Sequence, residues 1–416
     1  MIVAGRAART PKGVTLLVEL AELLQASVKD STPFVQRMNF PSRHPLYGGN
    51  VTQADLVLGL EVPDFYQQIH TTTPVNRMGM EARPTTKAGA KIATISSHEL
   101  LTKSNYQDFG RYNEVDLAIT ADAEATLPSL IEACRRLLTP DRQRMFQQRG
   151  VRVAESNRAA REVILEQAAF GWDARPISTA RLSAELWNQI KDEDWSLVSD
   201  ATFVTNWPLR LWNVTKHYQY IGWSGAYGIG YGAPAAVGAA LANRKHGRLS
   251  VNIQCDGDLN YAPGVLWTAA HHRIPLLTIM HNNRGYRQEL MYVEQQCSQC
   301  NRGADRAHIG TKLFILSLSV ALPQSGDAKK GKDLYLKYSC YSCHSFDGHG
   351  GAGARLVPMK MPVIAFTAYV RNPRQMPPYS LKVMPDAELA DVWAYLRTIP
   401  DSPAAKDIPL LRQATG

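Results

Sequence analysis

Long apolar runs, abundant cysteines and low-complexity segments are all missing from this sequence. It has no unbroken apolar run of about 18 residues, so we expect no membrane-spanning helix. Six cysteines among 416 residues are too few for a fold held together by disulfides. An apolar fraction of 45% and a charged fraction of 20% exclude wholesale disorder. A globular protein of about two or three domains is therefore expected.

Dense basic blocks are absent as well. The chain carries a net charge of +9, but its Lys and Arg residues are spread along the sequence. They form no aromatic-interleaved basic motif of the kind that binds nucleic acid. We therefore expect a basic surface exposed to water and no nucleic-acid partner.

Residues 1–140 alternate strand-like apolar runs with helical patterns. Strands separated by helices indicate a parallel, doubly wound sheet. Because the sequence starts inside its first expected strand, we expect that an upstream portion is missing. The expected strands are 1–5, 55–60, 91–95 and 116–119, and the expected helices are 13–24 and 125–138.

A second α/β unit, residues 177–311, follows a polar, helix-prone linker at 141–176. We expect this unit to be truncated, because it ends before the further strands and helix that would complete a sheet of this type. Its expected helix is 179–190, and its expected strands are 195–199, 249–254 and 276–281.

The composition changes in residues 312–326, which begin with Lys312 and the apolar run 313–322. A basic residue, an apolar run and a small or polar stretch have the layout of a secretory signal, although a buried strand or helix fits equally well. Residues 327–402 are rich in Gly, Met and Pro with helical patterns, and 403–416 read as a polar tail. The expected fold is two doubly wound parallel-sheet units, the second truncated, followed by a small all-α domain.

Polar residues end two neighbouring strands of the second unit. Asp256 follows the strand 249–254, and Asn283, 27 residues later, follows the strand 276–281. Parallel strands bring both ends to one carboxyl edge, where ligands bind. A carboxylate and an amide oxygen suit Mg²⁺, and Gly257 lets the backbone approach a diphosphate closely. The alternative is an acidic turn and an Asn-Asn loop in an unrelated α/β domain.

This pattern resembles the thiamine diphosphate-dependent enzymes of the acetolactate synthase and benzoylformate decarboxylase group, as do residues 230–238 and 266–270. The resemblance implies that 1–140 is the central domain of such an enzyme and that 177–311 is its diphosphate-binding domain. It places Asp256, Asn283 and the carbonyl of Gly285 on Mg²⁺, Gly257, Asp258 and Leu259 at the diphosphate, and Ile229 as the apolar wedge that holds the cofactor bent.

Three departures from the family bear on catalysis. The activating glutamate of these enzymes lies in an N-terminal pyrimidine-binding domain, which we expect this chain to lack. Tyr227 stands where relatives have small glycines against the pyrimidine, and the part of the domain after Thr311 is missing. We name no catalytic residue, and we expect a fragment that binds the cofactor but is inactive alone.

The run Cys340-Tyr341-Ser342-Cys343-His344 has the spacing of a c-type haem attachment motif. Two thiols form thioethers with the porphyrin, and the adjacent imidazole reaches the iron. The three groups must share one turn, which explains why they lie within five positions. The alternative is a chance Cys pair followed by a surface histidine.

The surrounding residues resemble small monohaem cytochromes c. Gly331 and Tyr335 lie on one face of a short helix, and 386–398 reads as the C-terminal helix that packs across it. The resemblance implies a methionine as the second axial ligand. Met376 is the best candidate because its loop precedes the last helix by about ten residues; Met384 is too near that helix, and Met359 and Met361 are weaker alternatives.

Three functions follow from these motifs. The first is a haem c electron carrier fused to a thiamine diphosphate and Mg²⁺-binding enzyme fragment. The second is a thiamine-dependent 2-oxo-acid lyase or oxidase that passes electrons to its own haem. The third is a non-functional gene-fusion remnant, for which a signal-like run at the join would be expected.

Partners and compartment follow from the same resemblances. A haem domain implies a redox partner protein, and the α/β domains imply a homo-oligomer, since relatives are dimers or tetramers. Covalent haem attachment implies the periplasm, whereas the α/β part implies the cytoplasm. The sequence leaves the compartment open.

Overall fold

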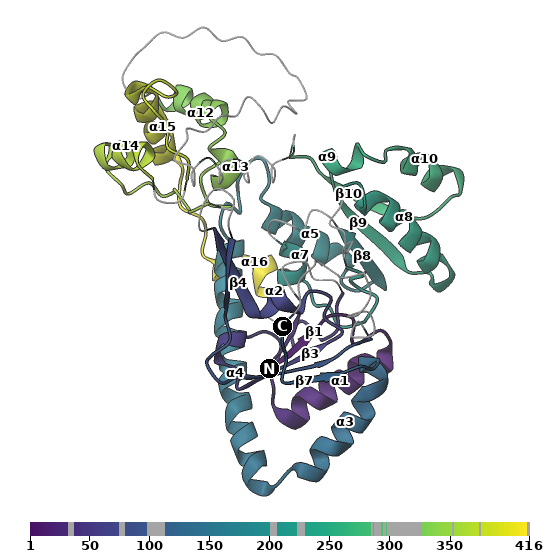
Figure 1. Cartoon of the computed structure of the whole chain (residues 1–416). Helices are drawn as coiled ribbons and strands as arrows, with labels where there is room; N and C mark the ends of the chain where they lie inside the picture. The colour runs from purple at the N-terminus through teal and green to yellow at the C-terminus, as the bar shows by residue number, and fades with distance from the viewer. Residues whose placement is uncertain are drawn as a thin grey trace.

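Two parallel sheets with their helices, one short hairpin and a separate group of helices make up the described chain (Figure 1). The computed structural model describes residues 1–31, 37–74, 80–97, 113–199, 206–222, 229–283, 286, 293, 297, 327–351, 353–373 and 376–413. The parallel α/β architecture expected from the sequence is confirmed, as is the helical C-terminal region.

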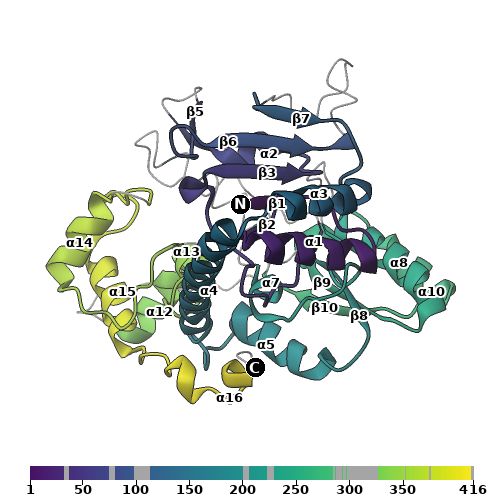
Figure 2. The same cartoon turned by 90° about the horizontal axis from the view of Figure 1, so that it is seen from below.

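The first sheet has the strand order β2-β1-β3-β6-β7, with every neighbouring pair parallel. Helix α1 (Pro11–Leu24) begins where the Thr10 side chain accepts a hydrogen bond from the backbone N–H of Gly13. Together with α3 (Ala123–Leu137) it covers one face of the sheet (Figure 2). The strands are β1 (Ile2–Ala4), β2 (Val28–Asp30), β3 (Leu56–Leu60), β6 (Lys91–Ile95) and β7 (Leu117–Ile119).

Besides the strand β2, four short elements near this sheet were not expected from the sequence. Two of them are strands that pair as an antiparallel hairpin within an otherwise parallel α/β unit. They are η1 (Val51–Gln53), α2 (Phe65–Ile69), β4 (His70–Pro74) and β5 (Met80–Pro84).

The expected linker is mostly one long helix, α4 (Pro140–Ala168). Its first turn is set by Pro140 and by the Thr139 side chain, which accepts from the backbone N–H of Arg142. Arg149 donates from Nε to the carbonyl of Gln25 at 3.2 Å, so α4 is tied to the end of α1.

The second sheet has the order β10-β9-β8, with both pairs parallel. Trp195, Leu197 and Trp212 are each 1% exposed, and they form its core together with the completely buried Val251. Its elements are α5 (Thr179–Ile190), β8 (Trp195–Ser199), α7 (Trp207–Leu211), α8 (Gly232–Asn243), η4 (Arg244–His246), β9 (Leu249–Cys255), α9 (Asp256–Leu259), α10 (Gly264–His271) and β10 (Leu277–His281).

Hydrogen bonds made by the backbone and the hydroxyl of Ser42 join the two sheet-containing units. The N–H of Ser42 donates to the carbonyl of Val214 at 2.9 Å, and the N–H of Val214 donates back to Ser42 Oγ at 3.0 Å. Ser42 Oγ also donates to the carbonyl of Trp212 at 3.2 Å. Ser42 lies in the first unit along the sequence, yet it forms hydrogen bonds with residues of the second unit.

The C-terminal helices pack around a crossing of the first and last of them. At Gly331 an added Cβ would lie 1.9 Å from the carbonyl oxygen of Asp391, so only glycine permits this approach. Tyr335, on the same face, is completely buried. The helices are α12 (Ala328–Lys337), α13 (Tyr341–His344), α14 (Val363–Arg371) and α15 (Asp386–Thr398).

The expected polar tail contains two further elements, η5 (Ala405–Asp407) and α16 (Pro409–Gln413). Among the described residues of the tail, Ile408 and Leu411 are buried. A reading based on composition misses them, because single apolar side chains in a polar stretch give no periodic pattern. The signal-like run 313–322 and Tyr227 lie outside the described residues. None of the helices that the structure describes is long and apolar enough to cross a membrane.

We expect the stability of the first unit to depend on pH through Asp30, which is 4% exposed. Asp30 Oδ1 accepts hydrogen bonds from Asn39 N at 3.1 Å and Nδ2 at 3.0 Å, and Oδ2 accepts from the Tyr47 hydroxyl at 3.2 Å. Burial nevertheless raises the pKa of Asp30 from 3.8 to about 7. The folded state thus holds the proton more tightly than the unfolded chain.

This stabilisation is present below about pH 4 and is lost as the pH rises through about 7. Its size is at most a few kcal/mol, since one pKa unit corresponds to about 1.4 kcal/mol. Chemical denaturation between pH 4 and 8 should give a shallower pH slope in Asp30→Asn than in the wild type. The exposed Asp192→Asn should keep the wild-type slope, and equal slopes in all three proteins would contradict the assignment.

Candidate functional sites

The end of β9 and the end of β10 lie side by side at one sheet edge. Cys255 pairs with His281 in the parallel register, so the residues that follow each strand emerge together. The backbone N–H of Asn283 donates to Asp256 Oδ1 at 3.2 Å. The structure thus brings together the two residues that the sequence proposes for Mg²⁺.

Asp258 connects this edge to the turn that carries Ile229. It is 7% exposed, and it accepts from Gln254 Nε2 at 2.5 Å and from the backbone N–H of Gly230. Ile229, the expected wedge, precedes Gly230 and has 42% of its surface exposed. Two segments 28 residues apart are therefore joined through one carboxylate.

Gly257 and Leu259 belong to the same short helix, α9, which Leu259 ends. The Tyr286 hydroxyl donates to the carbonyl of Gly257 at 3.3 Å, so the chain beyond β10 folds back onto the motif. Gly285, the third expected Mg²⁺ ligand, lies outside the described residues.

The donor set at this edge fits Mg²⁺. A carboxylate and an amide side chain offer the oxygen donors that this ion prefers, and the bond from Asn283 N restrains the Asp256 carboxylate. Gln254 was missed by sequence reasoning. It is completely buried inside the apolar strand β9, and a polar residue in such a run is the signal that could have identified it.

The second candidate site is the turn that contains Cys340, Cys343 and His344. The N–H of His344 donates to the carbonyl of Cys340 at 3.0 Å, so the first thiol and the imidazole lie one helical turn apart. Both cysteines are half-buried. The structure therefore places the three residues of the motif together, as the spacing predicts.

The His344 ring is held by the loop that follows it. Its Nδ1 atom lies 2.6 Å from the carbonyl oxygen of Ala354, which makes Nδ1 the protonated nitrogen. Burial lowers the pKa of His344, although the Ala354 carbonyl acts in the opposite direction. A neutral ring whose Nδ1 is already bonded fits iron ligation through Nε2.

The methionines near this turn differ in their surroundings. Met384 is 1% exposed and lies inside the core cluster of the helical domain. Met376 and Met359 are half-buried at the margin of that cluster, as are Cys340 and Tyr341, whereas Met361 is 41% exposed.

Two family models match the parts of the chain that contain these candidate sites. Residues 200–310 match the family model described as thiamine pyrophosphate enzyme, C-terminal TPP binding domain. Residues 326–396 match the one described as cytochrome C oxidase, cbb3-type, subunit III. The chain therefore combines a thiamine diphosphate-binding domain with a C-terminal cytochrome c domain. These two domains imply thiamine diphosphate with Mg²⁺ and haem c as cofactors.

Individual relatives are similar to a large part of the chain. A benzoylformate decarboxylase from Pseudomonas aeruginosa is 25% identical over 284 residues, which are 65% of this chain and 46% of that protein. The crystal structure of benzoylformate decarboxylase from Polynucleobacter necessarius is 16% identical with a TM-score of 0.50, covering 76% of this chain and 53% of that one. A 4-hydroxybenzoylformate decarboxylase from Rhodococcus jostii gives 22% identity, a TM-score of 0.48 and coverage of 70% and 50%. The chain spans about half the length of these relatives.

We expect Gly353→Ala to disturb the His344 ring. A Cβ at Gly353 would lie 2.9 Å from Cε1 and 3.0 Å from Nδ1 of that ring, so the ring or the loop must shift at a cost of about 1–3 kcal/mol. The variant should carry less haem per chain, or show a changed ligand field in its visible spectrum. Gly238→Ala, whose added methyl group meets open space, should leave both measurements unchanged. A wild-type spectrum in Gly353→Ala would show that the loop does not orient the ring.

Proposed function

We propose that residues 327–402 carry single electrons on a covalently bound haem c. The observation that carries the proposal is the turn in which Cys340, Cys343 and a neutral, oriented His344 lie together. The two cysteines would hold the porphyrin through thioether bonds, and His344 would ligate its iron. Bound haem c would supply one-electron transfer between a reduced donor and a redox partner protein.

We assign the second axial position to Met376. A ligand must reach the porphyrin at the edge of the core, where Met376 and Cys340 both lie. Met384 is enclosed by the core instead. A thioether ligand raises the reduction potential, which suits transfer to a downstream acceptor. Met359 shares the margin with Met376 and is the competing candidate.

We further propose that residues 177–311 bind thiamine diphosphate and Mg²⁺. Asp256, Asn283 and the carbonyl of Gly285 hold the metal, and Gly257, Asp258 and Leu259 adjoin the diphosphate. Ile229 is the wedge beneath the cofactor, and the bond from Gly230 to Asp258 supports its place beside the diphosphate motif. Bound thiamine diphosphate supplies an electron sink for cleavage next to a 2-oxo group.

In this proposal the 416-residue chain by itself binds that cofactor without turnover. The enzymes it resembles place the activating glutamate in a pyrimidine-binding domain, and no residue of this chain is assigned that role. Residues 200–310 supply the side of the cofactor cleft that binds the metal and the diphosphate. In the enzymes that this chain resembles, a pyrimidine-binding domain forms the other side.

A second candidate function is a thiamine-dependent lyase or oxidase that passes electrons to its own haem. One contact favours it: the guanidinium of Arg355, in the cytochrome domain, lies 4.4 Å above the ring of Phe170 at the end of α4. The haem domain thus contacts the α/β part of the same chain. Turnover of a 2-oxo acid with reduction of the haem would favour this function over the first.

The haem assignment is tested on the full chain, produced in a host that exports it and attaches haem outside the cytoplasm. We expect the mass of one haem on the purified chain, and its loss in the double variant Cys340→Ser, Cys343→Ser. Cys134→Ser, in α3, should keep the haem. Met376→Ala should lower the reduction potential, because a thioether ligand raises it. A lower reduction potential in Met359→Ala, with Met376→Ala unchanged, would assign the second ligand to Met359. A wild-type chain without covalent haem would overturn the haem assignment.

The thiamine diphosphate site is tested by calorimetric titration of the full chain with the cofactor, with and without Mg²⁺. Since loss of a mere supporting residue weakens metal sites by about 10–100-fold, Asp256→Ala should weaken Mg²⁺-dependent binding by at least about tenfold. Asp192→Ala, an exposed carboxylate, should bind as the wild type does. If Asp256→Ala binds the cofactor and Mg²⁺ as tightly as the wild type, the proposed site is wrong. If the isolated chain decarboxylates benzoylformate or pyruvate, the proposal that it is inactive alone is wrong.

A further inference from the structure

The chain returns to the second α/β unit after it has passed through the cytochrome domain. Ile408 and Leu411, from η5–α16, are 4% and 1% exposed. Both belong to the core cluster of the second sheet, which also contains Trp195, Leu211 and Trp212. In Figures 1 and 2, α16 lies beside α5 and away from α14 and α15. We refer to residues 405–413 as the C-terminal strap.

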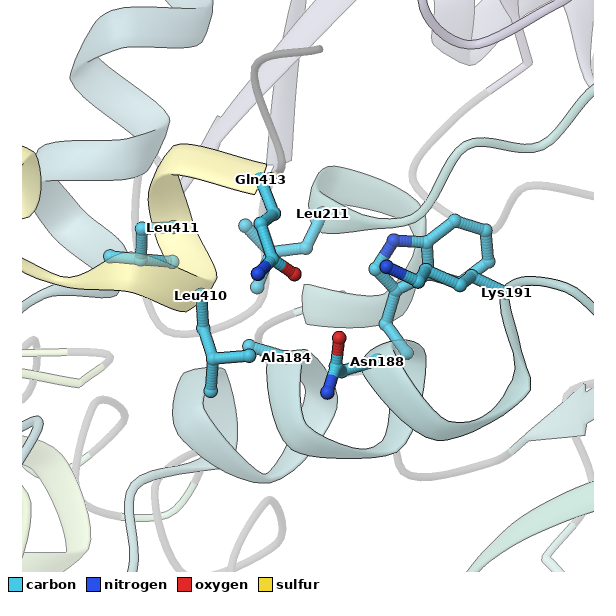
Figure 3. Close-up of a pocket in the computed structure, with 8 residues that line it drawn as sticks. Ala184, Asn188, Lys191, Leu211, Leu410, Leu411 and Gln413 are labelled. Carbon is cyan, nitrogen blue, oxygen red and sulfur yellow. The ribbon is translucent and has the colours of Figure 1, made fainter.

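The strap packs against the helices α5 and α7. Leu410, Leu411 and Gln413 face Ala184 and Asn188 of α5, and Lys191 at the end of that helix, across a small pocket (Figure 3). Leu211 of α7 closes another side of that pocket. Trp187 of α5 lines it too and lies 5.8 Å, centroid to centroid, from the buried Trp212. The strap therefore covers the aromatic core of the diphosphate-binding unit.

Residues 400–402, between the last cytochrome helix α15 and the strap, are bonded on both sides. His349 Nε2 lies 3.2 Å from the carbonyl oxygen of Pro400, and Arg355 forms an ion pair with Asp401, so this segment is bound to the cytochrome domain. The backbone N–H of Gly171 donates to Ser402 Oγ at 3.0 Å, which binds the same segment to the end of α4.

A helix as short as α16 is unstable alone in water. Its order must come from the surface that buries Ile408 and Leu411. That surface belongs to the α/β unit, although the residues follow the cytochrome domain in the sequence. The core of the second unit is thus built from two parts of the chain that lie on either side of the haem domain.

We propose that the cytochrome domain is inserted into the diphosphate-binding unit, rather than appended to it, and that the C-terminal strap completes the core of that unit. Folding of the α/β unit then depends on residues that follow the haem domain. An appended electron carrier on a flexible tether would leave the α/β core independent of them. The inference rests on the packing of the strap and holds whether or not either cofactor site is assigned correctly.

The test is hydrogen exchange measured by mass spectrometry on the full chain. In Leu411→Ala the amides of α5 should exchange faster by roughly tenfold or more, because truncation of a buried leucine is costly. The amides of α12 and α15 should keep their wild-type rates, which shows that the cytochrome domain remains folded. Lys406→Ala, an exposed residue of the strap, is the matched control and should change neither region. Unchanged exchange of α5 in Leu411→Ala would overturn the proposal.

A second measurement separates loss of the strap from a general failure to fold. A chain ending at residue 403 should show fast exchange in α5, and a synthetic peptide of residues 404–416 added in trans should restore slow exchange. A peptide with Leu411→Asp should not restore it. Slow exchange of α5 in the shortened chain without any peptide would show that the α/β unit is complete by itself, and the proposal would then be wrong.

Discussion

Parallel pairing of β9 with β10 is the constraint on which the diphosphate site depends. Because the two strands run in the same direction, the residues that follow Cys255 and His281 must emerge at one edge. Asp256 and Asn283 therefore meet there although 27 residues separate them along the chain. An antiparallel arrangement would place the two ends at opposite edges and leave no common site.

In the cytochrome domain the candidate site residues are close in the sequence, so they come together locally. Its reactive groups lie within one turn, so the local helix positions them, and the tertiary structure only needs to orient the imidazole. The carbonyl of Ala354 does this from ten residues away, and the close approach of Gly353 leaves the ring little freedom. A metal ligand with one ring nitrogen already bonded loses less conformational entropy when it binds iron.

Sequence reasoning succeeded where the pattern is local and periodic. The buried strands β3, β6, β8 and β9 and the helices α5 and α15 lie within one or two residues of the expected bounds. The hairpin β4–β5, α2 and α16 were missed, because they are short and their order comes from the surfaces they contact. The candidate site residues were proposed from motifs, whereas residues that contact them, such as Gln254 and Ala354, belong to no motif and reach their partners only in the folded chain.

The amino-acid sequence by itself was enough to predict the two cofactors of this protein. The acidic motif with its distant Asn283 and the two-cysteine motif with His344 are readable, since each depends on residue type and spacing. Only the tertiary structure decided how the two halves are connected. The last residues of the chain look like a polar tail, yet Ile408 and Leu411 lie in the core of the other unit. Their burial depends on a surface formed by residues far away in the sequence, and a local sequence pattern contains no information about that surface.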